Sequence, residues 1–190
     1  MSDIGHLLHT AYELVEALDK TTDSALPQEI ADVVKLHAKI AVGSAWIPVP
    51  GADVAAGAAN IWSMYLRINS KIGMKLGESV LKTIASAVAT NLASYAAVLA
   101  VGGMLKFIPG IGTIGGAVVM SAALYAVTLA SGYVYLKALT ALVRKGQVIN
   151  DQNLKDSVNA FMKDNKSDIQ NFIKAAKKEY KQENSDKKPE

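Results

Sequence analysis

The sequence contains no cysteine, and this absence excludes several classes of function. A chain of 190 residues without cysteine has no disulfide framework, no thiolate nucleophile and no cysteine-ligated zinc or iron–sulfur site. Its net charge of +3 is too small to favour nucleic acid as a partner. Only 19% of the residues are charged and 51% are hydrophobic, which is typical of a compact, apolar protein rather than a disordered chain.

Acidic residues are also missing from the middle of the chain. No Asp or Glu occurs in the 72 residues between Glu78 and Asp151. Two stretches of this region carry no charge at all, 83–105 with 23 residues and 107–136 with 30. Each is longer than the roughly 20 residues that cross a bilayer core of about 30 Å as a helix. The sequence therefore predicts an apolar, Ala/Gly-rich helical hairpin over about 83–144.

The usual motifs of enzymatic sites are absent or out of context. Gly110, Gly112 and Gly115 match G-x-G-x-x-G, but a helix and a proline precede them and no acidic residue follows at the required distance, so we reject a dinucleotide site. No P-loop and no G-x-S-x-G motif occurs. His6 and His9 could share a helix face with Glu13, but this pattern is more typical of a solvated face than of a metal site. We expect no catalytic residue, cofactor or metal.

Apolar residues recur at helical spacing through most of the chain, and no long stretch alternates with period two. The pattern predicts an all-α bundle built around the hairpin, divided into an amphipathic pair at 1–46, an apolar core at 47–146, short amphipathic helices at 147–181 and a disordered tail at 182–190. The expected helices are listed by approximate range: 4–18, 27–44, 53–74, 79–105, 117–145, 150–164 and 167–180.

Proline and glycine mark the ends of several of these helices. Pro48 and Pro50 lie in one turn and Pro109 in another, because proline cannot continue a helix. Asp53 follows the first turn, where it is expected to cap the next helix. In the helix after Pro27, the expected buried residues are Ile30, Val33, Val34, His37, Ile40 and Ala41.

Each helix of the predicted hairpin carries a stripe of small or hydrogen-bonding residues. The first stripe is Thr83, Ser86, Thr90, Asn91 and Ser94, and the second is Ser121, Tyr125, Thr128, Gly132 and Tyr135. Facing stripes of this kind allow close helix packing in a membrane. A helix that is apolar all round is equally suited to the middle of a water-soluble bundle.

The region from about 47 to 139 resembles a bacterial domain family of unknown function, the YcjF-like GTPase-associated family, whose members often follow Era-like GTPase domains. The resemblance is carried by Ile47-Pro48 with Pro50 and Asp53, by Ile108-Pro109-Gly110 with the glycines after it, and by the run 123–135. It implies a helical, membrane-associated module that works beside a GTPase. Since this chain has no GTPase motif, that GTPase would be a separate protein.

Together these features predict a non-enzymatic, membrane-associated protein, anchored by the hairpin, that docks a separate GTPase or a second copy of itself. The alternatives are a soluble protein that inserts the hairpin to permeabilise a membrane, and a soluble bundle that binds a lipid or other hydrophobic ligand. Without a signal sequence at the amino terminus, we expect the protein at the bacterial inner membrane or in the cytoplasm. The candidate interface and structural residues are Pro48, Pro50, Asp53, Pro109, Gly110, Gly112, Gly115, Ser121, Thr128 and Gly132.

Overall fold

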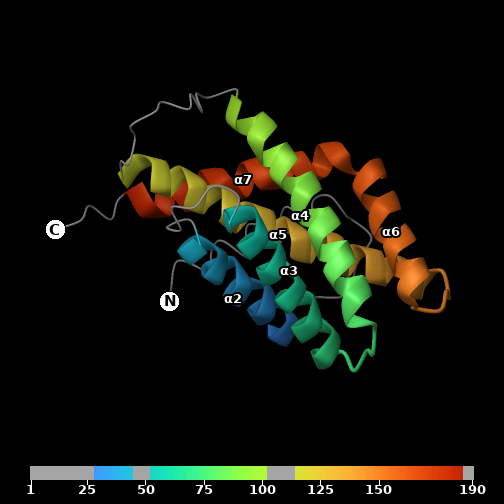
Figure 1. Cartoon of the computed structure of the whole chain (residues 1–190). Coiled ribbons are helices and arrows are strands. Elements are labelled where there is room, and N and C mark those ends of the chain that lie inside the picture. The colour runs from blue at the N-terminus through green and yellow to red at the C-terminus, as the bar shows by residue number, and fades with distance from the viewer. Residues whose placement is uncertain (1–27, 45–51, 102–113, 186–190) are drawn as a thin grey trace.

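The all-α prediction is confirmed by the structure, a computed structural model that describes residues 28–44, 52–101 and 114–185 (Figure 1). These residues form six helices and no strand. The helices are α2 (Gln28–Ser44), α3 (Ala52–Lys71), α4 (Glu78–Val101), α5 (Ile114–Arg144), α6 (Asp151–Asp164) and α7 (Lys166–Ser185). The expected helix at 4–18 lies outside the described residues. The disordered tail expected at 182–190 is wrong at its start, because α7 continues as a helix to Ser185, and 186–190 lie outside the description.

Helix α5 is the centre of the bundle. Every residue from Tyr125 to Gly132 is buried, so this part of the helix is covered on all sides. Its 31 residues include no carboxylate, and a helix without a charged face loses nothing by being enclosed. The other five helices pack on it, as Figure 1 shows, and their buried side chains form one continuous core with those of α5.

Helices α2 and α3 form an antiparallel pair on one side of α5. The side chain of Asn60 on α3 contacts His37 on α2 through two hydrogen bonds of 2.8 Å. Helix α3 runs parallel to α5. Tyr65 bonds Ser131 and Asn69 bonds Tyr135, so moving four residues forward along α3 also moves four residues forward along α5. The α2–α3 pair contributes two of the buried polar side chains, His37 and Asn69.

Helix α4 buries the apolar side of an amphipathic pattern and exposes the other. The buried side chains are Leu81, Ile84, Ala85, Val88, Ala89 and Leu92. In Figure 1, α4 runs across α5 rather than along its whole length. The predicted hairpin is therefore present as two neighbouring helices, but α5 packs on every other helix of the bundle as well.

Helices α6 and α7 run back along α5 as a bent arm. Ser157 on α6 donates a hydrogen bond of 2.9 Å to the carbonyl of Ala138. Further along, Tyr133 stacks on Phe172 at a ring-centroid distance of 5.5 Å. The bend lies at Asn165, between the end of α6 and the start of α7.

Two turns meet at one end of the bundle. Gly73 after α3 and Gly146 after α5 adopt left-handed φ values of 71° and 62°, which favour glycine at a helix end. The backbone N–H of Gly77 donates to Asp151 at 3.4 Å and so links the two turns. The end of the helix expected at 117–145 is confirmed to within one residue, since α5 ends at Arg144 and Gly146 follows it in the turn.

The amino-terminal cap of α6 provides a first test of this local structure. The side-chain oxygen of Asn150 accepts a hydrogen bond of 2.9 Å from the N–H of Asn153. We expect Asn150→Ala to lower the free energy of unfolding by about 1 kcal/mol, because it leaves a helix donor without that partner. Chemical denaturation measures this loss. Asn159→Ala, which truncates an exposed residue inside the same helix, is the control and should change little.

Candidate functional site

Three of the ten candidate residues lie in the core, and the side-chain surroundings of the other seven are not described. Ser121 and Thr128 are 3% and 2% exposed, and Gly132 is also buried. Pro48, Pro50, Pro109, Gly110 and Gly112 lie outside the described residues. Asp53 is the second residue of α3 and Gly115 is the second residue of α5. Only these helix positions are described for the two residues. The metal hypothesis for His6, His9 and Glu13 also falls outside the description.

Gly132 is the point of closest approach between α5 and α2. A Cβ atom at this position would lie 2.8 and 2.9 Å from the two terminal methyl carbons of Val34. Real Cβ atoms do not come this close to other carbon atoms, so glycine is required for α2 to sit where it does. The small-residue stripe on α5 therefore serves packing, with α2 as one of its partners.

A pair of buried tyrosines joins α3 to α5. The rings of Tyr65 and Tyr135 stack at a centroid distance of 4.0 Å with an interplanar angle of 13°. Tyr65 donates to the carbonyl of Ser131 at 3.1 Å, and Tyr135 donates to the side-chain oxygen of Asn69 at 2.7 Å. Burial raises the pKa of both hydroxyls above the ordinary value of tyrosine, so both are neutral donors at neutral pH. The pair is a structural clamp rather than a proton-transfer site.

His37 is the buried titratable group between α2 and α3. Its Nδ1 lies 2.8 Å from the side-chain oxygen of Asn60, while its Nε2 is buried and has no hydrogen-bond partner. Burial lowers the pKa of His37, and the positive charge of Arg67 lowers it further, although the bonds with Asn60 act in the opposite direction. The placement of His37 in the buried stripe is confirmed.

The lowered pKa of His37 predicts how the stability of the protein depends on pH. Because the folded state holds the pKa of His37 below its ordinary value of 6.5, the unfolded chain binds the proton first as the pH falls. We expect the free energy of unfolding to be unaffected by His37 above that value and to decrease as the pH drops below it. Denaturation of the protein and of a His37→Asn variant across this range measures the effect. Equal pH dependence of the two proteins would contradict it.

The stripe on α4 does not face α5, and this part of the hairpin hypothesis is wrong for the folded bundle. Thr83, Ser86, Thr90, Asn91 and Ser94 are all exposed. Their side chains, apart from Ser86, donate to carbonyls one turn earlier in the same helix. Burial of the larger apolar groups on the other side of α4 decides its orientation, since that burial is worth more than contacts between small polar groups.

Ile40 is a second correction. Its side chain is 48% exposed, and that of Leu36, one turn earlier on the same side of α2, is 43% exposed. The buried stripe of α2 is narrower than its apolar pattern, because α3 and α5 together cover only one side of the helix. An exposed aliphatic pair therefore remains on the outer side of α2.

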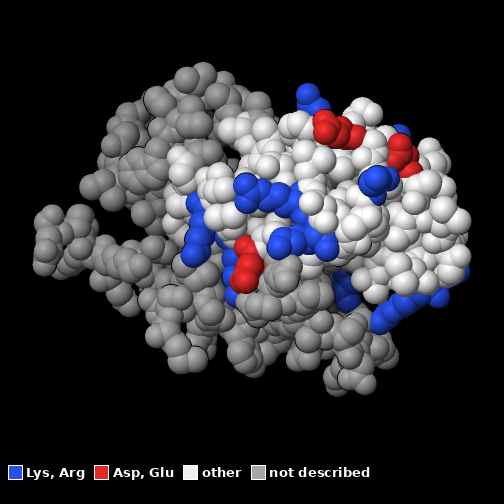
Figure 2. Space-filling model, turned by 90° about the horizontal axis from the view of Figure 1, so that it is seen from below, with Lys and Arg blue, Asp and Glu red and all other residues white. Residues whose placement is uncertain are grey.

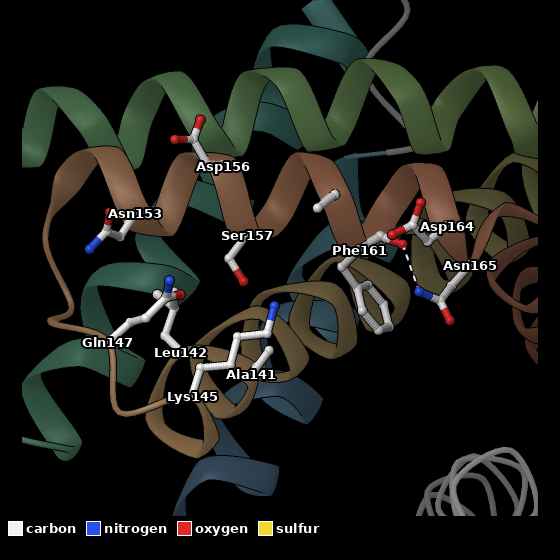
Figure 3. A pocket seen from close by; sticks show the side chains of 11 residues that line it. Ala141, Leu142, Lys145, Gln147, Asn153, Asp156, Ser157, Phe161, Asp164 and Asn165 are labelled. Atoms are coloured by element: carbon white, nitrogen blue, oxygen red, sulfur yellow. Dashed lines mark hydrogen bonds between the residues drawn. The ribbon is translucent and has the colours of Figure 1, made fainter.

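A groove of about 370 Å³ lies between the carboxyl end of α5 and α6 (Figure 3). Its polar lining groups include Lys145, Asn153, Asp156 and Ser157. Most are already bonded within the chain: Asn153 bonds the Val148 carbonyl, Asp156 accepts from Gln152, and Ser157 bonds the Ala138 carbonyl. In Figure 3, Asp156 points away from α5 whereas Ser157 points toward it, so the polar groups do not converge on one point. The groove is half-open and is lined by apolar groups such as Leu142 and Phe161 as well as by polar ones, so it differs from the enclosed, mainly apolar cavity typical of a lipid site.

None of these groups forms a recognisable catalytic arrangement. Among residues 28–44, 52–101 and 114–185, no group of three His, Cys, Asp or Glu side chains is placed to hold a metal ion. In the part of the chain that the structure describes, the groups with shifted pKa values are His37, Tyr65, Tyr135, Lys177 and Tyr180, and burial is the main cause in each case. They are distributed through the core of the bundle rather than gathered in the groove.

The comparisons with known proteins add no relative. No known protein family matches the chain, and no curated protein or solved structure shows significant similarity to it.

Proposed function

We propose that this chain is a non-enzymatic, membrane-associated helical protein that docks a partner while its bundle stays closed. The supporting observation is α5. Residues Met120–Arg144 are long and apolar enough to cross a membrane, yet 67% of an apolar stretch of 18 residues within them is buried inside the bundle. The whole helix of 31 residues is about 46 Å long, well beyond the usual three turns of a globular helix.

The exposed polar side of α4 favours a protein that binds at the membrane surface over one whose hairpin spans the membrane. A spanning α4 would place Thr83, Thr90 and Asn91 against lipid or a new partner, and Asn in particular opposes transfer into hydrocarbon. In the closed bundle these groups are in water and cost nothing. Peripheral association therefore requires no change of fold, since α5 stays buried in the core and the polar side of α4 stays in water.

Fractionation of cells that express the protein tests this proposal. We expect the protein in the membrane pellet and its release by high salt or alkaline carbonate, because a peripheral bundle is held by surface contacts. A protein that stays in the soluble fraction and binds no vesicle of any composition would contradict membrane association. A protein that needs detergent for release would contradict the closed, peripheral form.

Insertion of α5 with permeabilisation is the second candidate, and the same helix favours it. Here the surrounding helices would leave α5, which would then enter the bilayer. Release of a trapped dye from vesicles distinguishes this candidate from passive docking. We expect no release from vesicles that bind the closed protein.

For the docked partner, we propose a separate GTPase, with a second copy of the chain as the alternative. This proposal rests on the resemblance of the turns at Pro48 and Pro109. Affinity purification of the full chain in the presence of a GTP analogue or GDP tests it. Recovery of a GTPase that depends on the nucleotide supports the proposal, and the same protein composition with both nucleotides contradicts it. Light scattering of the purified chain tests self-association.

A further inference from the structure

The outer side of the α2–α3 pair combines positive charge with exposed aliphatic groups. We define the α2–α3 face by its described residues Asp32, Lys35, Leu36, Lys39, Ile40, Arg67 and Lys71. The two helices lie side by side, since Asn60 on α3 bonds His37 on α2. An antiparallel pair of this kind presents one continuous surface rather than the edge of a single helix.

Cations outnumber acids on this face. It carries Lys35, Lys39, Arg67 and Lys71, and the single carboxylate of the set is Asp32, 3.7 Å from Lys35. The view in Figure 2 is from below, the side on which α2 lies in Figure 1. Several blue side chains lie near the red group in the middle of this view, and further red groups lie toward the upper right. This surface is therefore electropositive and complementary to an anionic partner.

Two aliphatic side chains lie within the same positive surface. Leu36 and Ile40 are one helical turn apart, and both are more than two-fifths exposed. Lys39 is adjacent to Ile40, so charge and aliphatic surface alternate along the outer side of α2. Lysines beside exposed aliphatic groups are one feature of helices that lie in the plane of a bilayer interface.

The same combination favours a lipid surface over an acidic protein. An acidic protein surface would pair with the cations but would not require water-exposed Leu and Ile beside them. A bilayer supplies both phosphates at the surface and acyl chains a few ångströms beneath them. Long Lys and Arg side chains can reach the phosphates while the shorter aliphatic groups enter the boundary layer.

We propose that the α2–α3 face is the surface that binds anionic bilayers, with Lys39 and Arg67 at lipid phosphates and Leu36 and Ile40 in the acyl boundary. This inference rests on the proposed membrane association and names the surface responsible for it. It also places α2, which covers Gly132 of α5 through Val34, directly at the membrane.

Sedimentation of the full chain with vesicles tests the assignment. The probes are vesicles of phosphatidylcholine alone and vesicles with about 30 mol% phosphatidylglycerol, at about 0.1 M and about 0.5 M salt. We expect binding to the anionic vesicles only, weakened at the higher salt concentration. The Lys39→Glu/Arg67→Glu variant should bind at least about 25-fold more weakly, at about five-fold for each cation removed. The Leu36→Ser/Ile40→Ser variant should also bind more weakly, and its remaining binding should still decrease at the higher salt concentration.

A matched control has the same change of charge on another surface. Lys155→Glu/Lys163→Glu alters two exposed lysines on α6, which packs on α4, α5 and α7. We expect this variant to retain at least about half of the binding of the unaltered protein, since charges beyond a Debye length are screened. Circular dichroism and thermal unfolding establish that every variant folds.

The outcomes separate this inference from the proposed function. If the unaltered protein binds anionic vesicles but the α6 control loses as much binding as the α2–α3 variant, the assignment of the face is wrong and membrane association stands. If the unaltered protein binds no vesicle, both proposals fail. If it binds polyglutamate instead of vesicles, through the same two cations, the face recognises an acidic protein and the lipid assignment is overturned.

Discussion

Replacing Gly132 by leucine lowers the free energy of unfolding by about 3 kcal/mol or prevents folding, because the new side chain occupies the space of Val34. The two methyl carbons of Val34 already lie within 3 Å of where a Cβ would be. Helix α2 would have to move away from α5, which breaks other contacts of the pair. Chemical denaturation followed by circular dichroism measures the loss.

A double-mutant cycle shows whether this close contact is the cause. Gly132→Ala adds only the Cβ, and Val34→Ala removes the two methyl groups that it would meet. We expect each single change to destabilise the protein and the pair to be less destabilising than their sum. Gly57→Ala on α3 is the control, since no atom lies within 4 Å of that Cβ, and it should raise stability by about 0.5–1 kcal/mol. Simple additivity at Gly132 and Val34 would contradict the contact.

Replacing Tyr135 by alanine is expected to cost about 3–5 kcal/mol, comparable to other large aromatic truncations in a core. The ring is fully buried and stacks on Tyr65, and its hydroxyl bonds Asn69. Thermal and chemical denaturation both report this loss. A decrease below about 1 kcal/mol would show that α3 and α5 are not held together by this pair.

Tyr135→Phe separates the hydroxyl from the ring. It keeps the stacking but leaves the side-chain oxygen of the buried Asn69 without this donor, so we expect a loss of about 1–3 kcal/mol. The Tyr65→Phe variant is the matched comparison. Its bond goes to the backbone carbonyl of Ser131 rather than to a buried side chain, and a smaller loss is expected.

Most of the helices could be predicted from the sequence because their ends carry local signals. Gly146 and the cations before it end α5, and Asn150 caps α6. The uncharged run from 107 to 136 predicts a helix that must avoid water on every side, and α5 meets this need by lying at the centre. These features depend on neighbouring residues, so the sequence alone contains enough information to locate them.

The corrections concern which side of a helix is covered. Ile40 belongs to the apolar pattern of α2 but is exposed, and the polar stripe of α4 faces solvent rather than α5. Helical periodicity shows which residues share a side, but the number of neighbouring helices decides how wide the buried side becomes. That number is a property of the tertiary arrangement.

Specific contacts between helices that are far apart in the sequence could not be predicted from sequence patterns. Tyr65 and Ser131 are 66 residues apart, as are Asn69 and Tyr135. The equal separations reflect the parallel register of α3 and α5, which no local motif specifies. Tyr65 and Asn69 did carry a signal, since they share an otherwise apolar side of α3, but their partners could not be chosen without the fold.

Cysteine labelling shows whether the bundle remains closed when it is on the membrane, as we propose. Because the chain has no cysteine, Ser86→Cys on exposed α4 and Ser131→Cys on buried α5 each provide a single reactive site. On vesicle-bound protein, a membrane-impermeant maleimide should label the Ser86→Cys variant as fast as in solution and leave the Ser131→Cys variant unmodified until denaturant is added. Protection of Ser86→Cys on binding, or rapid labelling of Ser131→Cys in the bound state, would show that the bundle opens or inserts and would contradict the claim.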